Sequence, residues 1–153
     1  MKRVLVVDDE PLARRGLARL LKRHADFDVA GECGNGREAL RLLKEERFDL
    51  VLLDVEMPEL GGFEMLAQLE PELLPLVIFV TAFDQYAVRA FEAHALDYLL
   101  KPVSPERLAM ALKRASEGSR DLAPLIGELG HESKLPQRLA AKTGGRTVLV
   151  PVA

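Results

Sequence analysis

Five short apolar runs, separated by stretches with helical spacing, constrain the fold of this chain more than any other feature. The runs lie at residues 4–7, 27–30, 50–53, 76–80 and 95–100. They are apolar throughout and do not alternate, which is typical of parallel strands covered on both faces. This pattern predicts an α/β fold, a doubly wound five-stranded parallel sheet with helices on both faces. Right-handed crossovers would give the flavodoxin-like strand order 2-1-3-4-5.

Helical spacing predicts a helix after each strand. Pro11 suits a first helical turn, and the apolar stripe of that helix comprises Leu12, Leu17, Leu20 and Leu21. Asn35 is expected to cap the second helix. The last three helices are predicted over residues 62–69, 84–93 and 104–116, with Ser104 at the start of the final one.

Composition excludes several classes of protein. The chain has 153 residues, of which 48% are hydrophobic and 29% charged, as expected of a globular domain with residues to spare. Cys33 is the only cysteine, so no intrachain disulfide forms and a reducing cytosol is the simplest location. The N-terminus does not resemble a signal peptide, and no apolar stretch is long enough to span a bilayer. We therefore expect a cytoplasmic protein without membrane contact.

The strand–helix pattern fails near residue 117. Glycine and proline punctuate residues 118–136, which indicates a linker. Residues 138–142 and 146–150 flank Thr143-Gly144-Gly145, a signature of a β-hairpin. Because a lone hairpin is marginal in water, we interpret residues 137–153 as the start of a truncated β-rich domain. Residues 118–153 as a whole are mildly basic, whereas the rest of the chain is acidic.

Three aspartates follow two of the predicted strands. Asp8 and Asp9 come directly after the first strand, and Asp54 after the third. In the predicted strand order these ends are neighbours at the switch point, where ligands bind. Acids after strands can be ordinary solvated residues that cap the next helix. Three together, however, disfavour joint ionisation unless a cation is present, and their oxygens suit Mg²⁺.

The motifs at the strand ends resemble the receiver domains (CheY-like) of two-component response regulators. The resemblance covers residues 2–117, and every motif follows a predicted strand. The motifs are residues 4–9, Leu52-Leu53-Asp54 with Met57-Pro58, Thr81-Ala82, and Lys101-Pro102.

The resemblance implies a role for each matched residue around the acids. Asp54 would accept a phosphoryl group from the phosphohistidine of a sensor histidine kinase. Asp8, Asp9, Asp54 and the backbone carbonyl of Glu56 would bind Mg²⁺. Glu56 also adds a negative charge beside the site, and we hypothesise that its side chain alters metal affinity or the access of hydrolytic water.

The remaining motifs would stabilise and report the phosphoryl group. Lys101, the Thr81 hydroxyl and the Ala82 backbone N–H would contact it, and Tyr98 would be the aromatic residue that follows Thr81 when the domain switches. The Lys101–Pro102 bond is a candidate for the cis form. The alternatives are plain: Thr81 as a strand-end residue, Lys101 as a surface lysine, and Tyr98 as a half-buried tyrosine.

The resemblance also suggests an output. The fourth helix, fifth strand and fifth helix would form the output and homodimerisation face, around Tyr86, Arg89, Tyr98 and Arg107. Residues 79–91 and 97–102 are similar to receivers joined to a LytTR-type DNA-binding domain, and the tail from Arg146 fits its first strands. The full-length protein would then regulate transcription, contacting DNA only through the output domain that is largely absent here.

Two rival functions remain from the sequence. A stand-alone receiver could act by protein docking alone, although the basic tail disfavours it. A Mg²⁺-dependent phosphatase would use similar acids, but the sequence offers no second general acid–base, no histidine near the site and no glycine-rich phosphate loop. We therefore expect a switch and not an enzyme.

Overall fold

The computed structural model describes residues 1–117, 143–144 and 146–147. The chain divides into two units, Met1–Asp121 and Leu122–Ala153, which are described separately. In the first unit the strands are β1 (Lys2–Val7), β2 (Phe27–Cys33), β3 (Leu50–Leu53), β4 (Leu76–Thr81) and β5 (Asp97–Leu100). The helices are α1 (Pro11–Leu21), α2 (Gly36–Glu45), α3 (Gly62–Ala67), a 3₁₀ turn η1 (Pro71–Leu73), α4 (Ala87–Glu92) and α5 (Pro105–Ser116).

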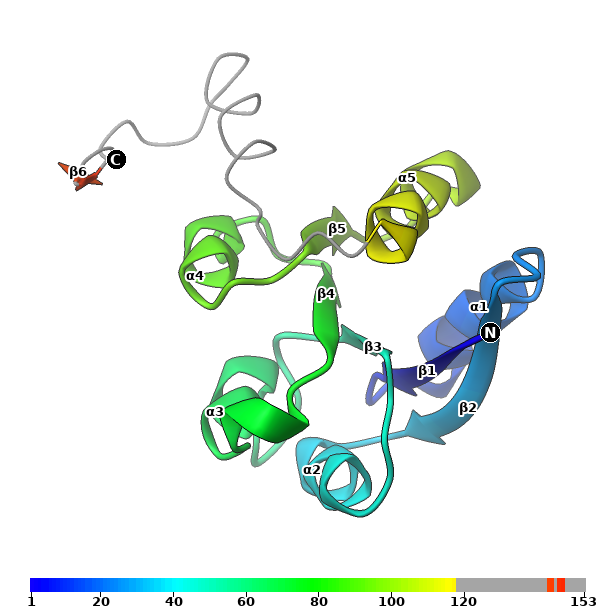
Figure 1. The fold of residues 1–153 in the computed structure, drawn as a ribbon, viewed down its shortest axis with the longest axis horizontal. Coiled ribbons are helices and arrows are strands. Elements are labelled where there is room, and N and C mark those ends of the chain that lie inside the picture. The colour runs from blue at the N-terminus through cyan, green and yellow to red at the C-terminus, as the bar shows by residue number, and fades with distance from the viewer. Residues whose placement is uncertain (118–142, 145, 148–153) are drawn as a thin grey trace. The chain divides into compact units, whose positions relative to one another are not determined.

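The five strands form one parallel sheet in the order β2-β1-β3-β4-β5, which confirms the predicted flavodoxin-like topology. Figure 1 shows α1 and α5 on one face of this sheet and α2, α3 and α4 on the other. The order reverses between β1 and β3, so the carboxyl ends of these two strands open the crevice in which such folds bind ligands.

How deeply each strand is buried depends on its position in the sheet. The central strands β3 and β4 are buried along their whole length, and so are the last four residues of β1. On one face they pack against Leu17 and Leu21 of α1 and Leu108 and Leu112 of α5. The prediction that all five strands are covered on both faces is wrong for β2 and β5, because each lies at an edge of the sheet and is partly exposed.

The helix caps are confirmed and several helix limits are corrected. Asn35 Oδ1 accepts a hydrogen bond from Glu38 N at 2.8 Å, and Ser104 Oγ accepts one from Arg107 N at 3.1 Å. Leu12 does not belong to the buried stripe of α1, since it is 80% exposed. Helix α3 ends early because its last turn tightens to i→i+3 bonds. Helix α4 begins only at Ala87.

In the second unit, Thr143–Gly144 (β6) and Arg146–Thr147 (β7) pair antiparallel. This pairing lies at the turn of the predicted hairpin. The predicted linker at 118–136 and the remainder of the predicted hairpin strands lie outside the described residues. Among the described residues, no helix is long and apolar enough to cross a membrane.

Candidate functional site

The register of the sheet brings the three aspartates together. Val7 and Leu53 are partners across β1 and β3, so the residues that follow them leave the sheet side by side. The Asp54 backbone N–H donates to Val7 O at 3.1 Å. Carboxylate oxygens of Asp8, Asp9 and Asp54 all lie within 4.8 Å of one another. Asp8 and Asp54 are buried, whereas Asp9 is more open to solvent.

Lys101 reaches this cluster from the end of β5. Its Nζ atom lies 2.8 Å from Asp8 Oδ2 and 3.0 Å from Asp54 Oδ2, and 3.6 Å from Glu10 Oε1. The Lys101 N–H donates to Thr81 O at 2.9 Å, which ties the chain to β4 just before the ammonium group enters the site. The Lys101–Pro102 peptide bond is cis.

The charges in the site do not balance. Three carboxylates and the nearby Glu10 face the single ammonium of Lys101. Asp8 Oδ2 is buried and faces Lys101 Nζ at 2.8 Å, the same ammonium that contacts Asp54 Oδ2. Two buried carboxylates with a third beside them fit a hard divalent cation such as Mg²⁺. This ion prefers oxygen ligands and is usually bound by one or two protein carboxylates together with waters.

Burial and charge act in opposite directions on the two central groups. Burial raises the pKa of the Asp54 carboxyl above its ordinary value, and the Asp8 charge adds to this, while the Lys101 ammonium opposes both. Burial alone would lower the pKa of Lys101, but hydrogen bonding and attraction to Asp8 and Asp54 outweigh it and raise the pKa. Lys101 is therefore a permanent cation in contact with Asp54.

Thr81 and the residues after it line the adjacent edge of the site. Thr81 is fully buried, and its Oγ1 accepts a hydrogen bond from Phe83 N at 3.3 Å. Ala82 is exposed. Tyr98 is half-buried on β5, and its hydroxyl donates to the backbone carbonyl of Phe83. Burial raises the pKa of Tyr98 to about 12.

The backbone and the side chain of Glu56 contact different residues. Its N–H donates to Asp54 Oδ1 at 3.3 Å, which holds the loop after β3 against the Asp54 carboxylate. Its carboxylate accepts a hydrogen bond from the Tyr86 hydroxyl at 2.6 Å. This hydrogen bond, together with burial and the Glu56 charge, raises the pKa of Tyr86. The sequence placed Tyr86 on the output face but did not predict this contact.

Two further contributors were missed from the sequence. Arg14 on α1 donates to the Asp8 backbone carbonyl at 2.6 Å and lies 3.4 Å from Glu32, so it anchors the turn that carries the acids. A basic residue in the first turns of the helix after the acids was the available signal. Gly62 packs against the backbone of Asp54, since a Cβ atom there would lie 2.5 Å from Asp54 O.

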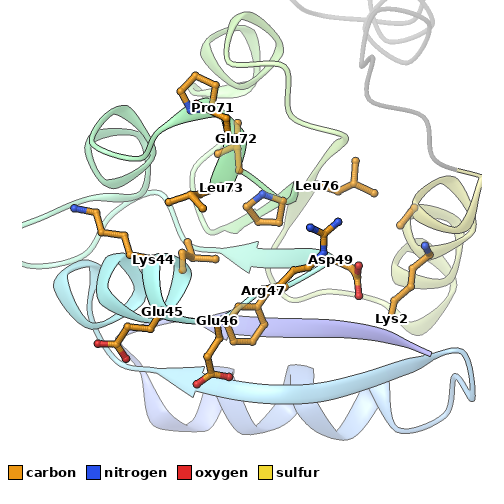
Figure 2. A pocket seen from close by; sticks show the side chains of 15 residues that line it. Lys2, Lys44, Glu45, Glu46, Arg47, Asp49, Pro71, Glu72, Leu73 and Leu76 are labelled. Carbon is orange, nitrogen blue, oxygen red and sulfur yellow. The ribbon is translucent and has the colours of Figure 1, made fainter.

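A cavity of about 600 Å³ lies at the opposite end of the sheet, between the segment from Lys44 to Asp49 and the turn around Pro71 (Figure 2). Its charged lining groups are Lys2, Lys44, Arg47, Glu45, Glu46, Asp49 and Glu72. Both signs are present here, and the acids are not gathered around one buried point. Although this cavity is spacious, it lacks the uncompensated buried charge found at the carboxyl ends of β1 and β3.

The response regulator receiver domain model matches residues 4–113, and the chain belongs to this family. It therefore carries the receiver domain of a two-component response regulator, a class of domain that generally acts as a phosphoacceptor switch and not as an enzyme.

Among curated relatives, the transcriptional regulatory protein BtsR of Salmonella typhimurium is 49% identical over 129 residues, covering 84% of this chain and 54% of BtsR. An uncharacterized response regulatory protein of Shewanella oneidensis is 43% identical over 148 residues, covering 97% of this chain and 61% of that protein. The chain thus spans between about half and three fifths of the length of these relatives.

Solved structures show the same fold. The response regulatory domain of mrkE from Klebsiella pneumoniae is 31% identical, with a TM-score of 0.69 over 76% of this chain and 96% of that domain. A LuxR-family DNA-binding response regulator from Staphylococcus aureus is 30% identical, with a TM-score of 0.69 over 75% of this chain and 98% of that one. A second similar structure is also described as LuxR-family. The comparisons therefore support the receiver but not the LytTR-type output domain.

Proposed function

We propose that this chain is a phosphorylation switch in which Asp54 accepts a phosphoryl group from the phosphohistidine of a sensor histidine kinase. The observation that carries the proposal is the buried Asp54 carboxylate, 3.0 Å from Lys101 Nζ and clustered with Asp8 and Asp9. The raised pKa of Asp54 leaves a basic carboxylate, and the adjacent cation compensates charge during transfer.

The transfer forms one bond and breaks one. An Asp54 carboxylate oxygen attacks phosphorus, the phosphorus–nitrogen bond of the phosphohistidine breaks, and its electron pair returns to the imidazole ring. The product is an acyl phosphate on Asp54. Lys101 stays within reach of the phosphoryl oxygens and offsets their charge. The Thr81 hydroxyl and the Ala82 N–H are the other proposed donors to those oxygens.

The residues that would hold Mg²⁺ are Asp9 directly, Asp8 through water, Asp54, and the Glu56 backbone carbonyl. Their fit rests on the cluster of carboxylate oxygens within 4.8 Å and on the burial of Asp8 and Asp54 beside a single ammonium, that of Lys101. When bound, the ion supplies charge neutralisation to the phosphoryl oxygens. The Glu10 N–H donates to Asp8 Oδ1 at 2.9 Å and orients the carboxylate, while Arg14 holds the Asp8 backbone carbonyl.

Transmission starts at Thr81. In the described state its Oγ1 accepts from Phe83 N, and the Tyr98 hydroxyl is held by Phe83 O. When Thr81 turns toward the phosphoryl group, the segment at Phe83 loses one contact and Tyr98 is free to move inward. This changes the surface of α4, β5 and α5, which we propose as the homodimerisation face.

The proposed output is transcriptional control. BtsR is named a transcriptional regulatory protein, and this chain spans only about half of it. We propose that the receiver works with a DNA-binding output domain, and that this domain is of the LytTR type, as residues 79–91 and 97–102 suggest. Two similar structures are instead described as LuxR-family. The proposed type of output domain is therefore independent of the proposed phosphoacceptor chemistry.

The acceptor is tested by intact-mass measurement after incubation with Mg²⁺ and a small phosphodonor such as acetyl phosphate. We expect wild type to gain one phosphoryl group and Asp54→Asn to gain none. The matched control is Asp49→Asn, which makes the same change at the opposite end of β3 and retains the gain. Failure of wild type to gain mass, or equal gain by Asp54→Asn, contradicts the assignment.

A further inference from the structure

The hydrogen bond between Tyr86 and Glu56 joins the acceptor loop to the start of α4. Glu56 follows the acceptor by two residues, and Tyr86 directly precedes Ala87, the first residue of α4. Their Oη and Oε2 atoms are 2.6 Å apart, although the residues lie 30 positions apart in the chain. The contact is therefore a product of the tertiary fold, and it fixes the carboxylate that lies nearest to Asp54 in the loop that follows it.

The Tyr86 ring is itself held in place. Its centroid lies 6.2 Å from the ring of Phe63 on α3 and 6.2 Å from that of Phe83 after β4. A second link runs parallel to the first: Arg89 of α4 lies 3.3 Å from Glu64 of α3 and 4.3 Å above the Phe63 ring. Because two aromatic neighbours fix the ring, the hydroxyl has a defined direction, and it points to Glu56.

The position of Glu56 matters because it lines an open cavity together with Asp9, one of the three clustered acids. A space of about 520 Å³ is lined by Asp9 and Glu56 together with Tyr86, Phe63 and Arg89. The Glu56 carboxylate is exposed and does not belong to the cluster formed by the other three acids. Without a tether, a flexible glutamate side chain could reach across this space toward a cation and occupy a ligand position.

We propose that Tyr86 is a positioning residue that holds the Glu56 carboxylate outside the cation site. This keeps a coordination position and the space above Asp54 open for the incoming phosphoryl oxygens. The inference rests on the proposed function of Asp54 as a phosphoacceptor. A freed Glu56 has two effects with opposite signs: a fourth carboxylate strengthens binding of Mg²⁺, and the same negative charge slows approach of an anionic phosphodonor.

The test uses Tyr86→Phe in the full chain, because phenylalanine keeps the ring contacts and removes only the hydroxyl. We expect the Mg²⁺ dissociation constant, measured by calorimetric titration, to fall by about threefold or more. The rate of phosphorylation by acetyl phosphate at saturating Mg²⁺ should fall by about threefold to tenfold. If Tyr86 had a merely structural role, its substitution would weaken Mg²⁺ binding and slow phosphorylation together. The test is therefore whether Mg²⁺ binds more tightly while phosphorylation becomes slower.

The matched control is the same substitution in a Glu56→Gln background. With the charge removed, Tyr86→Phe should change neither the Mg²⁺ dissociation constant nor the rate by more than about 1.5-fold. Unchanged or weaker Mg²⁺ binding in Tyr86→Phe, or an undiminished effect in the Glu56→Gln background, overturns the proposal. The Mg²⁺ titration does not require phosphorylation, so loss of phosphoryl gain in wild type would count against the acceptor assignment alone.

Discussion

Charged side chains are buried more deeply at the carboxyl ends of the central strands than at their amino ends. At the carboxyl end, Asp8 and Asp54 have side chains that are 1% and 8% exposed, and they share one Lys101 ammonium. At the amino end, Arg3 and Glu46 form a 2.7 Å ion pair with both side chains nearly half exposed. The cavity beside that pair has a volume of about 600 Å³, and its lining carries charges of both signs, most of them on exposed side chains such as Lys44, Glu45 and Arg47 (Figure 2).

The comparison teaches that volume does not identify the site in this molecule. Exposed ion pairs contribute little because water screens both partners. Buried like charges store an unfavourable energy that a bound cation can relieve, and this gives the carboxyl end a reason to bind a metal ion. The following predictions test this difference between the two ends.

The largest expected effect compares Lys101 with Arg3. Lys101→Ala should lower the phosphorylation rate by about a hundredfold, since it removes the fixed positive charge that touches Asp54. Arg3→Ala breaks an ion pair of similar length at the amino end and should leave the rate within about twofold. Acetyl phosphate kinetics followed by intact mass provide both numbers. Similar losses in the two variants would remove the functional distinction between the ends.

A smaller effect tests how tightly the backbone packs beneath the acceptor. In Gly62→Ala the new Cβ would lie 2.5 Å from Asp54 O and 3.2 Å from Leu53 Cγ, so the strand end or α3 must shift. We expect a loss of about 1–3 kcal/mol in the free energy of unfolding, measured with urea. Gly16→Ala in α1 meets no atom within 4 Å and should instead gain up to about 1 kcal/mol. Equal stability of the two variants would contradict the close packing.

The smallest effect concerns Cys33 at the carboxyl end of β2. Burial raises its pKa from the ordinary 9.0 to about 12. A raised folded pKa gives stability that is complete below pH 9 and is lost as pH rises toward 12, because the unfolded thiol ionises first. Between pH 9 and pH 10 wild type should lose about 1 kcal/mol more than Cys33→Ala in urea unfolding. Parallel pH profiles would show that the thiol ionises equally in both states.

Sequence patterns predicted the sheet because its strands obey a strong physical rule. Central strands of a parallel sheet are buried on both faces, so every residue in them has to be apolar. Runs such as 50–53 and 76–80 meet this requirement at each position. Edge strands and exposed helix faces carry weaker requirements. This is why the uniform burial of β2 and the inward position of Leu12 were predicted wrongly.

The acids were found by the same logic, since they follow the strands directly and the strand order sets which ends meet. Their partners were not, because a contact such as Tyr86 with Glu56 joins residues 30 positions apart and depends on the exact course of two loops. Arg14 and Gly62 lie near these acids in the chain, and a basic residue early in the first helix was an available signal for Arg14. Only the packing shows that its guanidinium meets the Asp8 carbonyl, or that a Cβ at position 62 would strike Asp54 O.

The sequence by itself therefore determined the sheet, its strand order and the identity of the acids at its carboxyl edge. Hydrophobic periodicity and the positions of Asp8, Asp9 and Asp54 are local properties that any correct fold must respect. Only the tertiary structure decided how deeply those acids are buried, that Lys101 serves two of them, and that Tyr86 holds Glu56 aside. These facts depend on distances across the sheet, and a distance between segments is set by packing and not by local sequence.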